Sequence, residues 1–298
     1  MKKLLLILFC FPMIGVGQSA TYVPDDNFEQ YLASIGLDGT GAIDDIVITS
    51  NINTVTFLSI SNKGISDLTG IQDFAALNLL WCDNNLLTTL DVSDNLYLDE
   101  LYCNNNQLTS LNVSSNMSLD RLDCYTNQLT SLNVNNCPNL EILSCYQNQI
   151  DNLDVSNNTQ LTFLNCFGNN LSSLDLSNNT NISSIDCRNN QLNSLNLHNI
   201  IWSGLSAFIS TGNASLFCID VDDPTTASSY LTAANGNIDA WSTFSVNCSA
   251  TYLDENNVIK NDLIKITDVF GRETKVENNQ PLFYLYNDGT IEKRIVIE

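Results

Sequence analysis

The sequence predicts a mainly β protein whose body is a right-handed solenoid of 21-residue repeats, with two narrow parallel sheets. The first observation is a constant spacing of 21 residues between six cysteines, which are Cys82, Cys103, Cys124, Cys145, Cys166 and Cys187. The second is the composition, with 44% hydrophobic and only 15% charged residues, which allows a substantial core and leaves a mostly uncharged polar half. A fixed period of this length is typical of a coil whose turns stack on one another.

Residues 1–17 are predicted to form a signal peptide. Two lysines open the chain, and the apolar run from Leu4 to Val16 that follows is too short to span a bilayer. Small residues before Gln18 fit the site that a signal peptidase reads. Because no later apolar run is long enough to cross a membrane, we expect an exported protein without a transmembrane segment.

Both ends of a stacked coil need covers, because each turn buries its apolar side chains only against its neighbours. Residues 18–54 are expected to cover the start, where the stretch from Pro24 to Leu32 is typical of a capped amphipathic helix. The repeats are predicted to occupy residues 55–202, with a degenerate first unit. Residues 203–248 lose the repeat and are expected to close the last turn of the coil.

Each unit reads L-x-x-L-x-C-x-x-N-x-L and continues as L-x-V-S-x-N, which is the leucine-rich repeat consensus with Cys in the third apolar slot. The pattern predicts one short strand in each unit, about 4.8 Å from the next strand. The L-x-V alternation of the second half predicts a second narrow strand on the opposite face. One asparagine recurs at a corner of every unit, and its amide is expected to bond the backbone of the turn. These residues are Asn85, Asn106, Asn127, Asn148, Asn169 and Asn190.

Nine cysteines remain after removal of the signal peptide. Stacked side chains about 4.8 Å apart are too distant for a disulfide, and a straight row cannot form a tetrahedral metal site. We therefore expect the six repeat cysteines to be reduced, buried thiols in a ladder beside leucine, and Cys137 to be a turn residue. Cys218 and Cys248 bracket residues 203–248 in an exported chain, so we expect a disulfide between them.

The repeats and the stretch from Thr21 to Glu29 resemble exported leucine-rich repeat proteins of one Gram-negative bacterial phylum. Residues 259–298, which follow a linker at 249–258, resemble a type IX secretion C-terminal sorting domain of type A. This resemblance rests on a D-x-x-G turn and on the later strands, with Asp268, Gly271 and Gly289 as motif residues. A Y-P-N-P-like opening stretch is absent. The resemblance implies a small all-β domain that is recognised by the type IX secretion machinery during passage through the outer membrane.

The charge excludes some classes of partner. Residues 18–248 carry three basic residues against 24 acidic ones, which gives a net charge of −21. Phosphate backbones and anionic lipid need clustered Lys and Arg, so we expect no nucleic acid as partner and no docking on anionic membranes. We also expect no cofactor and no metal, and a monomeric protein.

The outward positions that flank the buried L-x-C of each strand are predicted to form the binding face. They vary between repeats and include many aromatic residues, whereas the equivalent columns of the other face are monotonous. Aromatic stripes of this kind are typical of surfaces that bind a partner. The candidate ligand-binding residues are Trp81, Tyr102, Tyr125, Tyr146, Phe163, Phe167, Glu100 and Arg121. The alternative is that the rings only pack on one another and stabilise the sheet.

No catalytic residue is assigned, because the chain has a single histidine, His198, and lacks the common catalytic motifs. We therefore expect a non-catalytic secreted or cell-surface protein that binds a protein or glycan. Two alternatives remain open. One is a carbohydrate-active enzyme that uses Glu100 and Asp123 as paired carboxylates, and the other is a purely structural surface component. Three aspartates could hold Ca²⁺, although a solvated loop is the simpler interpretation of this stretch. They are Asp220, Asp222 and Asp223.

Overall fold

The computed structural model describes residues 19–39, 41–248, 263–267, 274–275, 281–286 and 291–295. The predicted signal peptide and the predicted sorting-motif residues Asp268, Gly271 and Gly289 lie outside these residues. The chain divides into two compact units, Met1–Val246 and Asn247–Glu298.

A small cap precedes the repeats in the first unit. Strand β1 (Ala20–Tyr22) pairs antiparallel with β2 (Ile46–Ile48), and helix α1 (Asp26–Ser34) lies between them in sequence, with the short α2 (Thr49–Ile52) after them. Helix α1 begins where the Asp25 carboxylate accepts the backbone N–H groups of Asn27 and Phe28. The cap is joined to the following coil through the same carboxylate, which also accepts Ser66.

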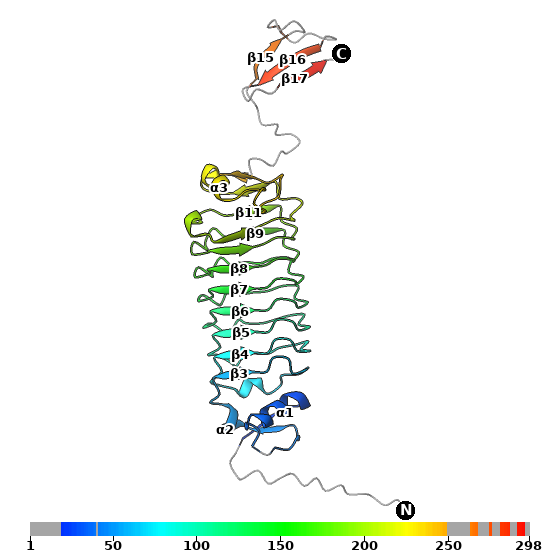
Figure 1. The fold of residues 1–298 in the computed structure, drawn as a ribbon, viewed down its shortest axis with the longest axis vertical. Coiled ribbons are helices and arrows are strands. Elements are labelled where there is room, and N and C mark those ends of the chain that lie inside the picture. Colours follow the sequence, from blue (N-terminus) through cyan, green and yellow to red (C-terminus); the bar gives the residue numbers. More distant parts are fainter. Residues whose placement is uncertain are drawn as a thin grey trace, which may run out of the picture. The chain divides into compact units, whose positions relative to one another are not determined.

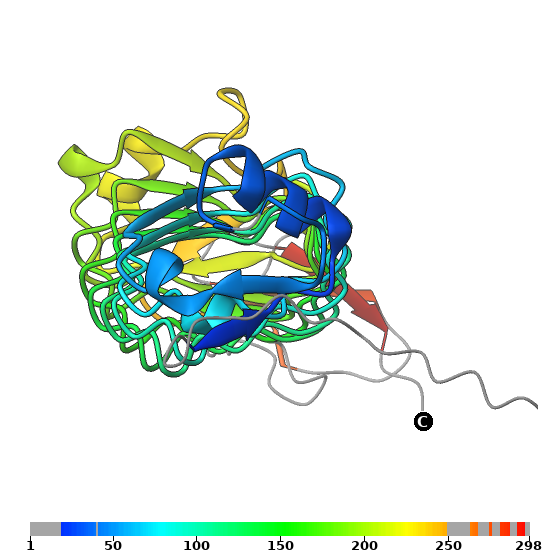
Figure 2. The same cartoon turned by 90° about the horizontal axis from the view of Figure 1, so that it is seen from below.

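The predicted fold class is confirmed: the body is a mainly β solenoid of stacked turns with a continuous parallel sheet (Figure 1). Within residues 19–248 this sheet has eight strands in the order β12-β10-β8-β7-β6-β5-β4-β3. The bounds of these strands are β3 Phe57–Ser59, β4 Leu79–Trp81, β5 Glu100–Tyr102, β6 Arg121–Asp123, β7 Ile142–Ser144, β8 Phe163–Asn165, β10 Ser184–Asp186 and β12 Ala207–Ile209. Figure 2 looks along the stack and shows the turns superposed around one interior.

The strands are in register, so each repeat position forms a straight column along the coil. The buried middle residue of every strand pairs with its equivalent, as Leu101 does with Leu122. Inward leucines and the six ladder cysteines are fully buried between turns. This is the packing that the L-x-x-L-x-C spacing predicts, because equivalent positions of successive turns all point into the interior of the coil.

The corner asparagine of each repeat links successive turns by hydrogen bonds. In Asn148, for example, the amide nitrogen donates to the carbonyls of Cys124 and Cys145 at 3.1 and 3.0 Å, and the amide oxygen accepts the Leu129 N–H at 3.0 Å. The same pattern recurs along the coil, so these side chains replace the backbone partners that a tight corner lacks.

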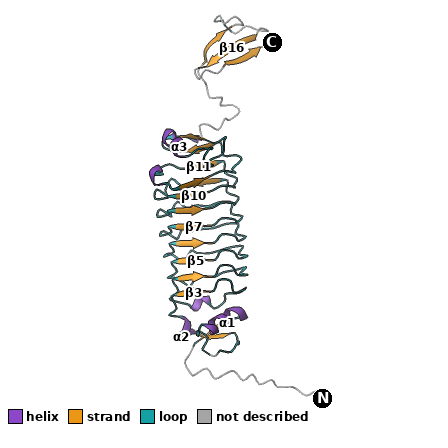
Figure 3. Cartoon of the chain, viewed as in Figure 1, coloured by secondary structure: helices purple, strands orange, loops and turns teal. Residues whose placement is uncertain are grey.

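The second sheet is shorter than the sequence pattern predicts. Its strands are β9 (Ser173–Asp175), β11 (Ser194–Asn196), β13 (Cys218–Asp220) and β14 (Thr243–Ser245), in the order β14-β13-β11-β9. Earlier turns hold only isolated bridges, in which Asn112 pairs with Asp91 and Asn133, so loops dominate that side in Figure 3. Regular strands begin on this side with the repeats in which Leu176 and Leu197 replace the recurring valine.

Residues 203–248 extend both sheets although their sequence has lost the 21-residue period. The 3₁₀ helices Ile71–Asp73 and Trp202–Gly204 lie at the two ends of the regular repeats, and helix α3 (Pro224–Tyr230) begins at the capping carboxylate of Asp223. A loop covers the edge next to β12, because the Asn237 side-chain amide donates to the Phe208 carbonyl and the Asn237 carbonyl accepts the Ser210 N–H. A covered edge does not recruit further strands.

The second unit contains an antiparallel sheet in the order β15-β16-β17, formed by Leu263–Thr267, Pro281–Tyr286 and Ile291–Ile295. A register shift between Leu263 and Lys265 interrupts its first pairing.

Candidate recognition face

The outward residues of the eight-stranded sheet form three columns, because two strand positions and the residue after the ladder cysteine all face away from the core. Five of the eight candidate residues occupy the second and third columns, and Glu100 and Arg121 contact residues of the second column. All eight are half-buried or exposed. The face therefore brings together residues that are far apart in the sequence.

The first aromatic group lies on the early repeats. Trp81 is 38% exposed and meets Tyr102 edge to face, with 5.6 Å between ring centroids. On its other side Trp81 meets Phe57 in the same manner at 5.3 Å. Phe57 is thus a further member of this face that the sequence prediction did not include. Its position in the degenerate first repeat, in register with Leu79, is the signal that could have found it.

Tyr102 also belongs to a polar cluster. Its hydroxyl donates to the Glu100 carboxylate at 2.6 Å, and the Arg121 guanidinium lies over its ring at 4.9 Å. Partial burial, together with the bond to Glu100, raises the pKa of Tyr102 above its ordinary value. Arg121 in turn donates from two nitrogens to Oδ2 of Asp123, at 2.9 and 3.1 Å.

The second aromatic group is a stacked ladder in the third column. The rings of Tyr125 and Tyr146 lie 4.2 Å apart and are inclined by only 8°, and Phe167 continues the stack 6.4 Å from Tyr146. Arg188 ends the ladder with its guanidinium 4.9 Å above Phe167. Burial and the neighbouring Tyr125 raise the pKa of Tyr146 to about 12. Cross-strand stacking of this kind stabilises a sheet, whether or not it also binds a partner.

Phe163 lies apart from both groups. It occupies the first column, in register with Ile142 on one side and Ser184 on the other, and is half-buried there. The predicted single stripe is therefore two aromatic groups in different columns.

A depression of about 570 Å³ lies where the aromatic residues change column, over the repeats of β3 to β6. Its lining includes Trp81, Asp83, Tyr102, Arg121, Asp123 and Tyr125. Asp123 is only 4% exposed, and its Oδ1 is buried without a hydrogen-bond partner. A buried carboxylate oxygen without a donor is uncommon, because leaving it unpaired costs free energy.

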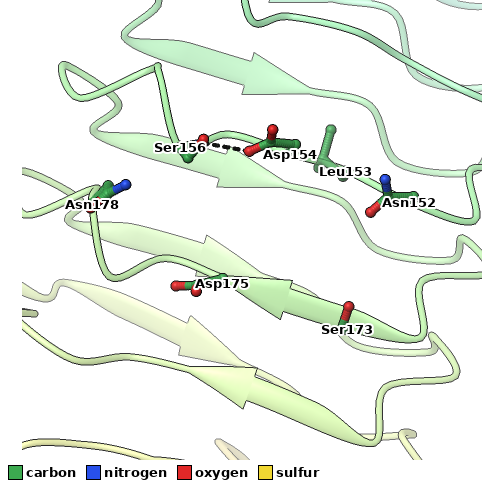
Figure 4. Close-up of a pocket in the computed structure, with 7 residues that line it drawn as sticks. All are labelled: Asn152, Leu153, Asp154, Ser156, Ser173, Asp175 and Asn178. Carbon is green, nitrogen blue, oxygen red and sulfur yellow. Dashed lines mark hydrogen bonds between the residues drawn. The ribbon is translucent and has the colours of Figure 1, made fainter.

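The opposite face uses its polar side chains on its own backbone. Asp154 accepts the N–H of Ser156 at 3.0 Å, and equivalent bonds recur from Asp91 to Asn196. A site of about 340 Å³ lies between two of these turns. Figure 4 shows the residues that line it, which are Asp154, Asp175, Leu153 and their serine and asparagine neighbours. The monotony of these columns thus reflects a structural requirement of the turn.

The aspartates of the predicted cap loop are also engaged locally. Asp222 accepts from the His198 ring and from the Asn199 N–H, and the bond to His198 is the main cause of its lowered pKa. Asp223 caps helix α3. Among the residues that the structure describes, no group of three or more His, Cys, Asp or Glu side chains could hold a metal ion.

The cysteines fall into two sets. The six ladder cysteines and Cys137 are buried free thiols. Cys137 lies where other repeats carry a buried asparagine, with its sulfur 3.7 Å from the carbonyl oxygen of Val113. Cys218 and Cys248 are disulfide-bonded, which is the state that the predicted bridge requires. In the described part of the chain, no helix combines the length and the hydrophobicity that a membrane span needs.

The repeat unit, the parallel sheet and the buried asparagine corners define a leucine-rich repeat protein. The chain resembles internalins of Listeria monocytogenes. It is 37% identical to internalin J of serotype 4b (strain F2365) over 86 residues, which cover 28% of this chain and 9% of that protein. The solved functional domain of InlJ, described as including a cysteine ladder, matches with a TM-score of 0.56 and 30% identity.

The match to the InlJ domain covers 72% of this chain and 56% of the solved one, so the chain spans little more than half of that structure. Internalin C2 of the same species matches with a TM-score of 0.44 and 20% identity, over 70% of this chain and 99% of that one. No family model matches the sequence. The row of six buried cysteines in this chain agrees with the cysteine ladder described for the InlJ domain.

Proposed function

We propose that this protein is a non-catalytic recognition protein, secreted or displayed at the cell surface, which binds a protein or glycan through the face of its eight-stranded sheet. The observation that carries the proposal is the concentration of half-exposed rings on this face, from Trp81 to Phe167. Such rings supply the large, rigid contact area that recognition surfaces need. The opposite face supports it by contrast, since its side chains satisfy their own turns.

The enzyme alternative gains no support from the geometry of its two carboxylates. Glu100 accepts the Tyr102 hydroxyl, and Asp123 is buried and ion-paired with Arg121 at 2.9 Å. A glycosidase needs a general acid and a second carboxylate that both act on one glycosidic bond, whereas the Glu100 carboxylate is bonded by Tyr102 and the Asp123 carboxylate is paired with Arg121.

Replacing Tyr125 and Tyr146 by Ser tests the face directly. On a glycan and protein array, the double variant should lose about 2 kcal/mol or more of affinity per ring for any partner of the strand face. The fold should survive, because the inward Leu122 and Leu143 are unchanged. The free energy of unfolding should fall by only about 0.5–1 kcal/mol for each ring, through the loss of cross-strand packing.

The matched control pair, Asn133→Ser with Asp154→Ser, lies on the opposite face and should keep the affinity of the parent protein. Circular dichroism establishes that all variants are folded. Equal affinities for the tyrosine pair and the control pair would show that the rings stabilise the sheet and do not bind a partner.

We also propose that residues 259–298 direct export through the outer membrane by the type IX machinery, after the signal peptide has led the chain to the periplasm. The support is the sequence resemblance given above. Deletion of residues 259–298 should leave a folded solenoid in the periplasm, because the repeats and the covers at residues 18–54 and 203–248 lie upstream. Fractionation and immunoblotting measure this. Truncated protein in the medium at the level of the full-length chain would contradict the proposal.

A further inference from the structure

The depression on the recognition face combines aromatic walls with an incompletely satisfied carboxylate. Trp81 and Tyr102 end the second-column group beside it, and Tyr125 begins the third-column ladder. Asp123 lines it with a buried Oδ1 that has no hydrogen-bond donor. The other lining carboxylate, Asp83, is bonded to Ser61 and Asn84. The chain itself therefore leaves one acceptor of this site without a donor.

A cation already occupies part of the site. The Arg121 guanidinium lies over the Tyr102 ring and pairs with Oδ2 of Asp123, and its side chain is 35% exposed. All three basic residues of the solenoid lie over rings in this way, since Lys63 lies 4.8 Å from the centroid of Tyr31 and Arg188 lies over Phe167. Aromatic faces next to carboxylates attract cations by the ring quadrupole and by charge.

Two observations favour a protein partner over a sugar. Tyr125 and Tyr146 stack on each other at an 8° inclination, and Arg121 lies over the Tyr102 ring, so these ring faces are not open to stacking by a sugar ring. The solenoid between residues 18 and 248 has a net charge of −21, which draws basic segments toward it over long distances.

We propose that this depression binds a lysine or arginine side chain from a basic segment of a protein partner. The proposal rests on the proposed function of the strand face and specifies the chemistry of the partner. The incoming cation donates to Oδ1 of Asp123 beside Tyr125, while the half-exposed Arg121 side chain moves toward solvent. The volume of about 570 Å³ is sufficient for a group of this size.

The probe for this site is octalysine, with fully acetylated octalysine as its uncharged counterpart and chitohexaose as a glycan. Isothermal titration of the folded protein should show binding of octalysine alone. Asp123→Asn should weaken it at least fivefold, whereas Asp154→Asn, an equal change of charge on the opposite face, should weaken it less than twofold. Asp83→Asn should also weaken it by more than this control, which keeps the test valid if Asp123→Asn fails to fold.

Arg121→Gln gives a result of opposite sign. Because it removes the competing cation, it should strengthen octalysine binding at least threefold, compared with less than twofold for Arg188→Gln, which changes the charge equally. Equal effects at the site and at the control positions would overturn the proposal and leave only general electrostatic attraction. Binding of chitohexaose that Trp81→Ala abolishes, without octalysine binding, would assign the depression to a glycan and overturn it as well.

The two proposals fail in different ways. If the octalysine series contradicts a cation site while Tyr125→Ser with Tyr146→Ser still lowers the affinity for an array partner, only the chemistry of the depression is wrong. If the tyrosine pair behaves as its control does, the recognition face itself is wrong.

Discussion

The free energy of unfolding of the solenoid should fall steeply above pH 9, because the thiol ladder cannot ionise inside the fold. Burial raises the pKa of the Cys145 thiol from 9.0 to about 12, and it raises the pKa of Cys103, Cys124 and Cys166 well above 9.0. In the unfolded chain the same thiols lose their protons near pH 9. The folded state then binds more protons than the unfolded state, so stability decreases as the pH rises.

The expected slope is large because the effect repeats. Each thiol that stays protonated in the fold lowers the free energy of unfolding by about 1.4 kcal/mol per pH unit above its unfolded pKa. Six ladder thiols acting together give about 8 kcal/mol per pH unit, which is comparable with the whole stability of a typical domain. Below pH 8 this contribution is constant. Urea titrations between pH 8 and pH 10 measure it.

Cys145→Ala isolates the contribution of one thiol. It should reduce the slope by about 1.4 kcal/mol per pH unit, independently of any constant loss from the smaller side chain. Tyrosines and lysines that titrate in the same range affect parent and variant equally. An unchanged slope in Cys145→Ala would show that the alkaline transition does not depend on the ladder. Thiol reagents should also fail to modify the ladder before unfolding.

The sequence predicted the repeat geometry well, because the 21-residue period fixes both the buried strand positions and the corner positions of each turn. A cysteine every 21 residues, two positions after a leucine, fixes which side of each strand is buried. The corner role of residues such as Asn148 followed from the same spacing. Within residues 19–248 the parallel sheet and its register agree with these expectations.

The candidate site was less predictable, because it depends on which of several neighbouring side chains each residue contacts or hydrogen-bonds. The columns could be read from the sequence, yet they do not show that Tyr102 bonds Glu100 and lies beneath Arg121 while Tyr125 stacks on Tyr146. The unpaired Oδ1 of Asp123 arises because Arg121 bonds only the other oxygen. Phe57 was missed because its repeat lacks the cysteine by which the other units were aligned.

Replacing Asn148 by Ala should cause the other large effect, a loss of about 1–3 kcal/mol of stability, because the side chain is the acceptor for a buried backbone N–H and also bonds two successive turns. Removal of the amide leaves the Leu129 N–H without an acceptor in a corner that is only 9% exposed. The carbonyls of Cys124 and Cys145 each lose one donor but keep the amides of Asn127 and Asn169. A loss of this size lowers Tm by about 2–12 °C in a body of this length.

Asn148→Asp separates hydrogen bonding from shape. It keeps the size of the side chain and an acceptor for the Leu129 N–H, but it loses the amide donors and places carboxylate oxygens beside the carbonyls of Cys124 and Cys145. Asp should therefore cost at least as much as Ala, whereas packing alone would make it nearly neutral. Asn152→Ala, at an exposed position four residues away, should change stability by less than about 0.5 kcal/mol. Thermal unfolding by circular dichroism compares the three variants, and a harmless Asn148→Asp would mean that the corner asparagines act by shape and not by bonding successive turns.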